Sequence, residues 1–333
     1  MNQKLKSVEA VACANIALIK YWGKRDVLLN LPAVGSISLT LEALKTRTRI
    51  TFNPDLNQDQ LMINKNPASE LQRKRVENFL DIIREISDCS FYADISSENN
   101  FPTGAGLASS ASAFAALSLA SVHAVDLKID KNELSELSRR GSGSAARSIF
   151  GGIVEMQKGE DALGRDDFAV QIASQDYWDL RVIIVITSTE EKSIGSTEAM
   201  NLSAATSPYY ASWVKSSDRD LEEMRTAINE RDFEKLGELT EYSALKMHAL
   251  TLSSRPAVLY WNHTTLQLIE EVRALRLKGV PAYFTIDAGP QVKIVTSGDY
   301  VNELINHFST FKGIDKCIES KLGPDAALVG DDG

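Results

Sequence analysis

Hydrophobic and polar side chains alternate along the beginning of the chain at the spacing of β-strands. Residues 7–20 (SVEAVACANIALIK) and 46–52 (TRTRITF) follow this pattern, and the second segment is rich in β-branched residues. Residues 70–87 (ELQRKRVENFLDIIREIS) instead place apolar side chains about 3.6 residues apart, which predicts a helix. Residues 91–97 (FYADISS) return to a strand-like pattern. The beginning of the chain therefore predicts strands and a helix in one unit.

The middle of the chain carries two interruptions rich in glycine and serine. Residues 99–125 predict a turn that opens an alanine-rich helix, and residues 131–139 have helical spacing again. Residues 141–152 (GSGSAARSIFGG) break this helix, and residues 152–157 (GIVEMQ) predict a strand. Glycine lets backbone N–H groups approach a ligand closely, so we consider both interruptions as candidate binding segments.

A continuous β-branched run, Arg181–Ser188 (RVIIVITS), predicts a strand that is buried on both faces. We place a boundary just before it, which gives two lobes, 1–178 and 179–333. Three helical segments and a strand–turn–strand segment follow the run, at residues 209–229, 232–247, 264–278 and 282–297. The order of elements is not a regular βαβ alternation, so we expect an α+β architecture.

The composition limits the class of protein. The chain has 333 residues, of which 44% are hydrophobic and 24% charged, and this is enough apolar material for a sizeable core. Its formal net charge is −9, without the basic footprint that nucleic-acid binding requires. An anionic substrate would therefore need local lysines and arginines that override the overall charge.

Cysteine usage and the N-terminus bear on location. Cys13, Cys89 and Cys317 are far apart and lack CxxC spacing, so we expect reduced thiols rather than a disulfide or zinc site. The N-terminus has no secretory apolar region, and the longest strongly apolar run, near residues 182–186, is too short to span a bilayer. We expect a cytoplasmic protein without a membrane partner.

The glycine-rich segment 102–112 (PTGAGLASSAS) is the first candidate for chemistry. It follows a predicted strand and opens a helix, whose N-terminus supplies free N–H donors and a partial positive charge for phosphate. Ser109 and Ser110 add hydroxyls for phosphate oxygens or Mg²⁺. The segment is neither a Walker A loop nor a GxGxxG motif. The alternative is a serine-capped core helix after a glycine turn.

Three further segments are candidates for binding or catalysis. Residues 15–24 (NIALIKYWGK) place two lysines beside an aromatic pair, although a solvated strand end would look similar. Residues 142–147 (SGSAAR) cluster hydroxyls and an arginine at the apparent start of a helix, which suits an anion or a simple helix cap. Asp287 lies in a turn between two apolar strands, where it is either a carboxylate of controlled pKa or an Asx-turn residue.

Together, NIALIKYWGK, PTGAGLASSAS, SGSAAR and FTIDAGP (284–290) occur in this order over nearly the whole chain. They resemble the motifs of the mevalonate diphosphate decarboxylases in the GHMP-kinase superfamily. Other GHMP kinases share the glycine-rich segment but not KYWGK or SGSxxR. Gly104 is a departure, because decarboxylases of this group usually carry Ala there. The resemblance implies a two-lobed GHMP-kinase fold, with a ribosomal-S5-like N-terminal lobe and a C-terminal GHMP lobe across a deep cleft.

The resemblance also implies an activity. The family converts (R)-5-diphosphomevalonate and ATP to isopentenyl diphosphate, ADP, phosphate and CO2, in the mevalonate pathway of isoprenoid biosynthesis. Phosphorylation of the tertiary 3-hydroxyl makes it a good leaving group, and its departure builds positive charge at C3, so that the adjacent carboxylate loses CO2. Phosphoryl transfer itself needs mainly positioning and charge neutralisation. ATP, Mg²⁺, the small-molecule substrate and a homodimeric assembly are the implied cofactors and partners.

Roles are implied residue by residue. Asp287 orients the 3-hydroxyl and accepts its proton, while Lys20 keeps Asp287 ionised. Arg147 grips the substrate carboxylate with help from Asn15. The implied substrate contacts are Tyr21, Trp22, Gly23, Lys24, Arg75, Ser142, Gly143, Ser144, Ala145, Ala146, Arg147 and Thr197. The implied ATP contacts are Pro102, Gly104, Ala105, Gly106, Leu107, Ala108, Ser109, Ser110 and Ser112, with Ser110 also on Mg²⁺.

Three other functions stay open. The same chemistry on the monophosphate would give isopentenyl phosphate, and Thr197 bears on this choice because many bacterial relatives carry Arg there. A kinase that stops after phosphorylation is disfavoured by the presence of both Lys20 and Asp287. A non-catalytic GHMP-fold binding protein has no chemical need for the full set of motifs. His248 is expected to be a packed or capping histidine rather than a catalyst.

Overall fold

Two long strands, β1 (Ser7–Ile19) and β4 (Ser36–Asn53), form the centre of the N-terminal sheet in the computed structural model, which describes residues 6–101, 107–187 and 194–330. They pair antiparallel, and the sheet order is β14-β1-β4-β7-β5-β6. Strand β8 pairs with β4 and with β9. The shorter strands are β5 (Gln60–Ile63), β6 (Asn66–Pro67), β7 (Tyr92–Asn99), β8 (Ile153–Met156), β9 (Ala169–Ala173) and β14 (Ala327–Leu328).

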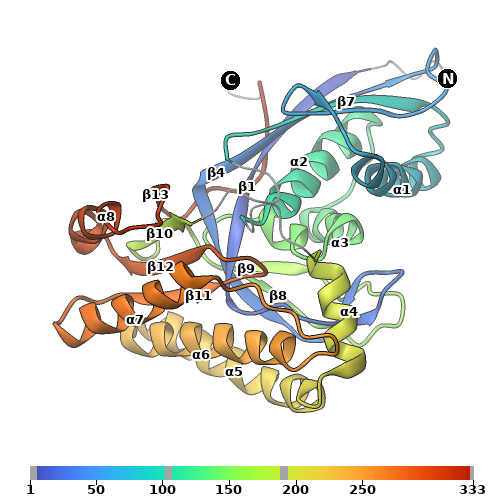
Figure 1. Ribbon diagram of the computed structural model, residues 1–333. Helices are drawn as coiled ribbons and strands as arrows, with labels where there is room; N and C mark the ends of the chain where they lie inside the picture. The colour runs from blue at the N-terminus through green and yellow to red at the C-terminus, as the bar shows by residue number, and fades with distance from the viewer. Residues whose placement is uncertain (1–5, 102–106, 188–193, 331–333) are drawn as a thin grey trace.

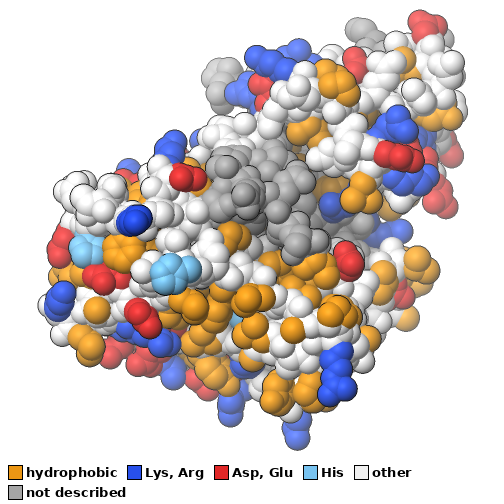
Figure 2. Space-filling model, in the orientation of Figure 1, with side chains coloured by type: hydrophobic (Ala, Val, Ile, Leu, Met, Phe, Trp, Pro, Cys, Tyr) orange, Lys and Arg blue, Asp and Glu red, His pale blue; other side chains and the backbone are white. Residues whose placement is uncertain are grey.

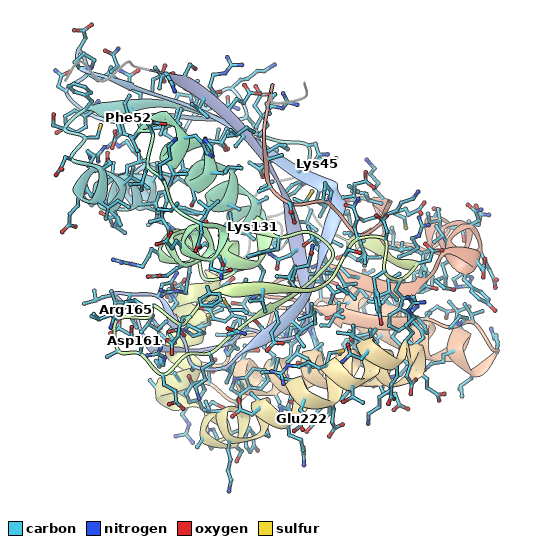
Figure 3. The ribbon with its side chains drawn as sticks, turned by 180° about the vertical axis from the view of Figure 1, so that it is seen from behind. Lys45, Phe52, Lys131, Asp161, Arg165 and Glu222 are labelled. Atoms are coloured by element: carbon cyan, nitrogen blue, oxygen red, sulfur yellow. The ribbon has the colours of Figure 1, made fainter. Side chains whose placement is uncertain are left out.

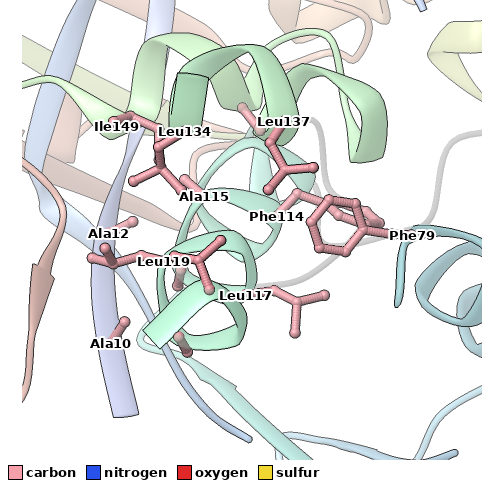
Figure 4. Close-up of a cluster of buried hydrophobic side chains, with 14 of the residues drawn as sticks. Ala10, Ala12, Phe79, Phe114, Ala115, Leu117, Leu119, Leu134, Leu137 and Ile149 are labelled. Carbon is pink, nitrogen blue, oxygen red and sulfur yellow. The ribbon is translucent and has the colours of Figure 1, made fainter. Parts of the chain in front are cut away.

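Three helices pack on one face of this sheet, α1 (Glu70–Ser87), α2 (Ser109–Ala124) and α3 (Lys131–Gly141) (Figure 1). Helix α2 is buried along most of its length, and its alanines let it lie close to β1; in Figure 4, Leu119 of the helix lies beside Ala12 of the strand. A tight approach of helix and sheet excludes voids and so stabilises the core. The alanine-rich sequence is thus explained by packing.

The C-terminal sheet has four strands in the order β11-β12-β10-β13. Alternate side chains of β10 enter two different cores, because Val182 and Ile184 pack with α5 and α6, whereas Ile183 and Val185 pack with α7 and α8. The predicted burial of this strand on both faces is therefore confirmed. The elements are β10 (Leu180–Ile186), β11 (Tyr283–Ile286), β12 (Val292–Ser297), β13 (Lys316–Ser320), α5 (Tyr210–Glu230), α6 (Phe233–Leu252), α7 (His263–Leu277) and α8 (Val301–Ser309), with the short helix η2 (Gly298–Tyr300) before α8.

The two halves of the molecule share a hydrophobic core. Ile16 and Leu18 of β1 pack in one cluster with Val182 of β10 and Leu236 of α6. The C-terminal strand β14 also returns to the N-terminal sheet, where Leu328 pairs with Ala10. The end of β1 is consequently buried between both halves, and residues that follow it lie where the halves meet.

Charged side chains are dispersed over the surface. In Figure 2, acidic and basic side chains are interspersed, while hydrophobic ones gather over the lower part of that face. The view from behind shows Asp161 and Arg165 together in the segment between β8 and β9, where they form an ion pair at 2.7 Å (Figure 3). In the described part of the chain, no helix is long and apolar enough to cross a membrane.

Most predicted elements are confirmed, and the helix over residues 70–87 has the predicted bounds. The sequence patterns missed α4 (Ser196–Thr206), α8, the first half of β4 and the short strands β5, β6, β9, β13 and β14. That half of β4 is buried on both faces, so it lacks the alternation that marks a half-exposed strand. The three cysteines are free thiols, as predicted.

Candidate active site

An ion pair joins the two sheets where the halves of the molecule meet. Lys20 follows the end of β1, and Asp287 follows the end of β11. The Nζ atom of Lys20 lies 2.6 Å from Asp287 Oδ1 and also donates to the carbonyl oxygen of Ala17 at 2.9 Å. The backbone N–H of Lys20 donates to Ser243 Oγ of α6 at 2.9 Å. Two predicted catalytic residues, 267 positions apart in the chain, are therefore in direct contact.

Positive charge surrounds Asp287. Burial opposes ionisation of its carboxyl group, but three neighbouring cations outweigh burial and lower the pKa of Asp287 below the usual 3.8. These cations are Lys20, Lys293 and Arg147. Asp287 is consequently ionised at neutral pH, which is the state that a proton acceptor needs.

Arg147 is 2% exposed and has only uncharged hydrogen-bond partners. Its guanidinium donates to Ser36 Oγ at 2.6 Å, to Ser38 Oγ at 3.0 Å and to Asn15 Oδ1 at 3.2 Å. Among the residues that the structure describes, no carboxylate forms an ion pair with it. Burial lowers the pKa of Arg147 to about 10, so it still carries its charge at neutral pH. A buried guanidinium without a carboxylate partner is suited to an incoming anion.

The segment that carries Arg147 is a short 3₁₀ helix, η1 (Ala145–Ile149), rather than the start of a longer helix. Asn15 anchors it, because its Nδ2 atom donates to Ser144 O at 3.0 Å and to Ser148 Oγ at 2.8 Å. The hydroxyl of Tyr21 lies over Gly143, where a β-carbon would come within 2.4 Å of it. Glycine at position 143 therefore lets Tyr21 approach the segment.

Lys24, Thr197 and Arg75 come together at another part of the site. Lys24 Nζ lies 3.5 Å from Thr197 Oγ1, at the beginning of α4. Burial, and to a lesser degree repulsion by Arg75, lowers the pKa of Lys24 to about 8. The guanidinium of Arg75, on α1, lies 5.2 Å from the centre of the Phe114 ring. Two cations and a hydroxyl that converge in this way offer a binding surface to an anion.

The beginning of α2 carries the described part of the glycine-rich segment. Ala108 is the N-cap residue, its φ of 56° is left-handed, and no side chain caps the helix. Ser109 and Ser110 occupy the first helical positions and are partly exposed. The unpaired N–H groups and the helix dipole at this end are suited to phosphate. The other predicted phosphate contacts, Pro102, Gly104, Ala105 and Gly106, lie outside the described residues.

The predicted ATP and substrate segments touch each other. Ser142 Oγ lies 3.4 Å from Ser110 Oγ and 3.3 Å from Ser144 Oγ, so three hydroxyls form a chain between α2 and η1. Leu107 and Ser112 are buried, and the Ser112 hydroxyl lies 2.6 Å from Thr46 Oγ1. Leu107 and Ser112 therefore support α2 from the core, whereas Ser109 and Ser110 lie at its partly exposed beginning.

Trp22 and Gly23 shape the loop between Lys20 and Lys24. Trp22 is buried, its ring contacts the edge of Tyr260, and its carbonyl oxygen accepts from Trp213 Nε1 at 3.0 Å. Gly23 has a φ of 99°, and a β-carbon there would come within 2.1 Å of the Tyr210 hydroxyl. Both residues therefore hold the backbone so that the two lysines flank the site.

The sequence did not single out four residues that contact the site. Ser36 and Ser38 lie two positions apart on β4, so both face Arg147, and Ser243 accepts from Lys20. Lys293 lies 3.8 Å from Asp287 Oδ2. The available signal was weak: two small polar residues at strand spacing, and a lysine within the apolar strand VKIVTS.

His248, which carries a titratable ring near the pair, packs in the core instead. It is 1% exposed and its ring centre lies 4.8 Å from that of Trp261. Burial, with help from the charge of Lys20, lowers the pKa of His248 to about 3, so the ring is neutral at neutral pH. A surface cavity of about 370 Å³ lies elsewhere, between residues such as Asp176, Arg181 and Lys321, and includes none of the predicted site residues.

Comparison with known proteins places the chain in a family. The model described as the diphosphomevalonate decarboxylase-like N-terminal domain matches residues 12–169, and that of the mevalonate 5-diphosphate decarboxylase C-terminal domain matches residues 182–326. The curated diphosphomevalonate decarboxylase of Homo sapiens is 38% identical over 91% of this chain and 80% of its own length. The chain belongs to the diphosphomevalonate decarboxylase family. The family member of Candida albicans is 36% identical over 96% of both chains.

Solved structures of the decarboxylase family agree with this assignment. The mevalonate diphosphate decarboxylase from Staphylococcus aureus has a TM-score of 0.92 and 39% identity, covering 99% of each chain. A structure described as MDDEF in complex with MVAPP, AMPPCP and magnesium has a TM-score of 0.91 and 38% identity, covering 98% of this chain and 99% of that one. The predicted α+β fold of the GHMP-kinase type and the enzyme class are thereby confirmed.

Proposed function

We propose that this enzyme decarboxylates (R)-5-diphosphomevalonate with ATP, through phosphorylation of the 3-hydroxyl, to isopentenyl diphosphate, ADP, phosphate and CO2. The observation that carries the proposal is the contact of 2.6 Å between Lys20 and Asp287, near a buried Arg147 that forms no ion pair among the described residues. A carboxylate held ionised can accept a proton, and a buried guanidinium can hold a carboxylate. Curated relatives that are named for this activity support it.

Asp287 is proposed to orient the 3-hydroxyl and to take its proton as the hydroxyl oxygen attacks the γ-phosphorus of ATP. Lys20 keeps the carboxylate ionised until that moment and lends positive charge nearby. The phosphate group then leaves C3, and positive charge develops there. The bond between C2 and the carboxylate carbon breaks, its electrons form the C2=C3 double bond, and CO2 leaves. These residues thus supply positioning and charge, which are the main needs of phosphoryl transfer.

Arg147 is proposed to bind the substrate carboxylate, with Asn15 holding the segment in place. Its five N–H donors form a planar fork, and Ser36, Ser38 and Asn15 already fix its orientation. Binding of a carboxylate would satisfy the buried charge. The interaction of Arg147 with the substrate is lost once the carboxylate has left as neutral CO2, and this favours release of the products.

The beginning of α2, with Ser109 and Ser110, is proposed to hold the ATP phosphates. Mg²⁺, when bound with ATP, neutralises charge on the transferring phosphate, and the Ser110 hydroxyl is the group that we propose as its protein contact. Both hydroxyls are partly exposed at an uncapped helix end, which fits phosphate binding.

Lys24, Arg75 and Thr197 are proposed to bind the diphosphate tail, together with Tyr21 and Ser142. The tail carries more negative charge than a monophosphate, so a patch with two cations fits it better. The monophosphate is the alternative substrate, and a ratio of kcat/KM values measured on both substrates decides between them. A preference for the diphosphate supports the proposal, whereas turnover on the monophosphate alone overturns it.

The lobes 1–178 and 179–333, the homodimer and the cytoplasmic location stay predictions. Light scattering after size-exclusion chromatography measures the assembly directly. A dimer mass of twice 36.6 kDa is the expected result.

Replacement of Asp287 tests the proposed chemistry. Asp287→Ala removes the proton acceptor and leaves Lys20 without its partner, so kcat should fall by several orders of magnitude, on the order of 10⁴-fold, while ATP still binds. The matched control is Asp299→Ala, which removes an exposed carboxylate after β12. Near-normal turnover of Asp287→Ala in a CO2-release assay would remove Asp287 from the mechanism.

A further inference from the structure

Lys293 is a second lysine at the candidate catalytic carboxylate. It lies on β12, where it pairs with Thr285 of β11 on one side and with Ile184 of β10 on the other. Its Nζ atom lies 3.8 Å from Asp287 Oδ2, whereas Lys20 contacts Oδ1 at 2.6 Å. Each oxygen of the carboxylate therefore has its own lysine, one from each sheet.

The strand around Lys293 gives no packing reason for a charge. Lys293 is 2% exposed, and its neighbours Val292 and Ile294 are completely buried. β12 is an interior strand, flanked by β11 and β10. Burying an ammonium group is costly unless an opposite charge compensates it, and an apolar residue of similar length would pack here at lower cost. The position of Lys293 is thus explained by the charge of Asp287 rather than by the core.

The titratable groups around Asp287 come from four parts of the fold. Lys20 follows β1, Arg147 belongs to η1, and Lys293 belongs to β12. His248 of α6 also lies within reach, but its ring is neutral at neutral pH because burial lowers its pKa to about 3. Among the described residues, three cations therefore act on the Asp287 carboxylate.

We propose that Lys293 is a positioning residue, which holds the Asp287 carboxylate ionised and aligned from the side opposite Lys20. The inference rests on the proposed function, since it assigns Asp287 the proton-accepting role. Lys293 does not need to touch the substrate for this role. It acts on Oδ2 at 3.8 Å, so its effect is mainly electrostatic, and removal of its charge should make Asp287 easier to protonate.

The test is a titration of the Asp287 carboxyl carbon by NMR in protein labelled at the aspartate carboxyl groups, with Asp287→Asn used to assign the signal. Lys293→Met keeps the length of the side chain and removes the charge. We expect it to raise the pKa of Asp287 by about one unit, because an opposite charge this close lowers a carboxyl pKa by about 1–3 units. Lys316→Met is the matched control: it removes an exposed lysine from the same sheet and should leave that pKa unchanged.

A second readout is the pH dependence of kcat/KM for CO2 release. Its acidic limb should move to higher pH in Lys293→Met but not in Lys316→Met, with KM changing less than kcat. An identical pKa of Asp287 in Lys293→Met and the unaltered protein would overturn the proposal. If Lys293→Met does not fold, Lys293→Gln takes its place, because it also removes the charge but keeps a polar side chain; an unchanged pKa of Asp287 in that variant would likewise overturn the proposal.

These readouts also separate the inference from the proposed function. If the unaltered enzyme releases no CO2 from the diphosphate substrate, the proposed function fails. The NMR titration needs no turnover, so it still shows whether Lys293 controls the ionisation of Asp287.

Discussion

Two arginines of the N-terminal half, Arg139 and Arg147, are both buried, but their surroundings differ. Arg139, at 0% exposure, donates to three carbonyl oxygens, those of Leu29, Gly164 and Asp167. The carboxylates of Glu136 and Asp167 also lie close enough to act on its charge. Arg147, at 2% exposure, has only hydroxyl and amide partners and no ion pair in the described part of the chain.

The difference separates a structural arginine from a functional one. Arg139 ties the segment between β8 and β9 to the turn before β3 (Leu31–Pro32), so all its bonds serve the fold. The charge of Arg147 is oriented but not neutralised, and this costs stability in the absence of a ligand. Binding sites commonly carry such a cost in stability, because a side chain whose charge and hydrogen bonds are already paired within the protein cannot also bind the substrate.

Of the two arginines, Arg147 should have the larger effect on turnover when it is replaced, as in Arg147→Met. Loss of the guanidinium should lower kcat/KM by about 10²–10³-fold, which corresponds to about 3–4 kcal/mol of lost interaction with the substrate carboxylate. Stability should fall less than in Arg139→Met, because the hydrogen bonds lost by three uncharged partners are offset by removal of a buried charge that forms no ion pair in the described part of the chain. Urea unfolding and CO2-release kinetics on the same preparation measure both. If Arg147→Met is destabilised but keeps its kcat/KM, Arg147 is a structural residue like Arg139.

Arg139→Met should give the opposite result. Three carbonyl oxygens lose their donor, and the carboxylates of Glu136 and Asp167 lose a neighbouring cation, so the free energy of unfolding should fall by about 3–5 kcal/mol. The kcat of the folded fraction should change little, because Arg139 has no proposed contact with substrate. Chemical denaturation gives the stability, and active-site titration gives the folded fraction. Loss of turnover without loss of stability would make Arg139 a functional residue too.

A smaller effect is expected at Lys24, another cation that is proposed to bind the substrate. Burial lowers its pKa to about 8, so Lys24 is protonated below that pH and becomes neutral above it. Because kcat/KM reports the ionisation of the free enzyme, kcat/KM for the diphosphate should decline on the alkaline side of about pH 8. Lys24→Met should raise KM about tenfold, from the loss of one charge-assisted hydrogen bond, and should remove this limb.

The exposed Lys128 offers a matched control for Lys24. Lys128→Met removes the same charge far from the proposed tail site, so the alkaline limb should persist. If the alkaline decline of kcat/KM persists in Lys24→Met, that decline comes from the ionisation of another group.

The sequence predicted the α+β class and most of the long elements because their patterns are local. The helix over residues 70–87 has one apolar face, a capping box at Ser69 and a left-handed residue at Asp88, so local signals agree there. The first half of β4 was missed because it is buried on both faces and has no alternation. Helix α4 was missed as well. Its first residues contact Lys24, and a contact between segments so far apart in the chain cannot be predicted from a local pattern.

The candidate site was predictable where a residue stands out in its motif. Lys20, Arg147 and Asp287 were found in this way, but their mutual contacts depend on strand pairing and on the shared core, which the sequence does not display. Ser36, Ser38 and Lys293 were missed because serine and lysine in a strand are ordinary by themselves. They gain meaning only from the side chain that they face in the folded protein.

The most direct test of the account is the ratio of CO2 to ADP formed by the unaltered enzyme from carboxyl-labelled diphosphomevalonate, ATP and Mg²⁺. A site with an ionised Asp287 and with an Arg147 that forms no ion pair in the described part of the chain should couple phosphoryl transfer to loss of the carboxyl group. One CO2 for each ADP is expected, together with isopentenyl diphosphate. ADP formed without CO2 would contradict it, since the protein would then be a kinase that stops at the phosphorylated alcohol.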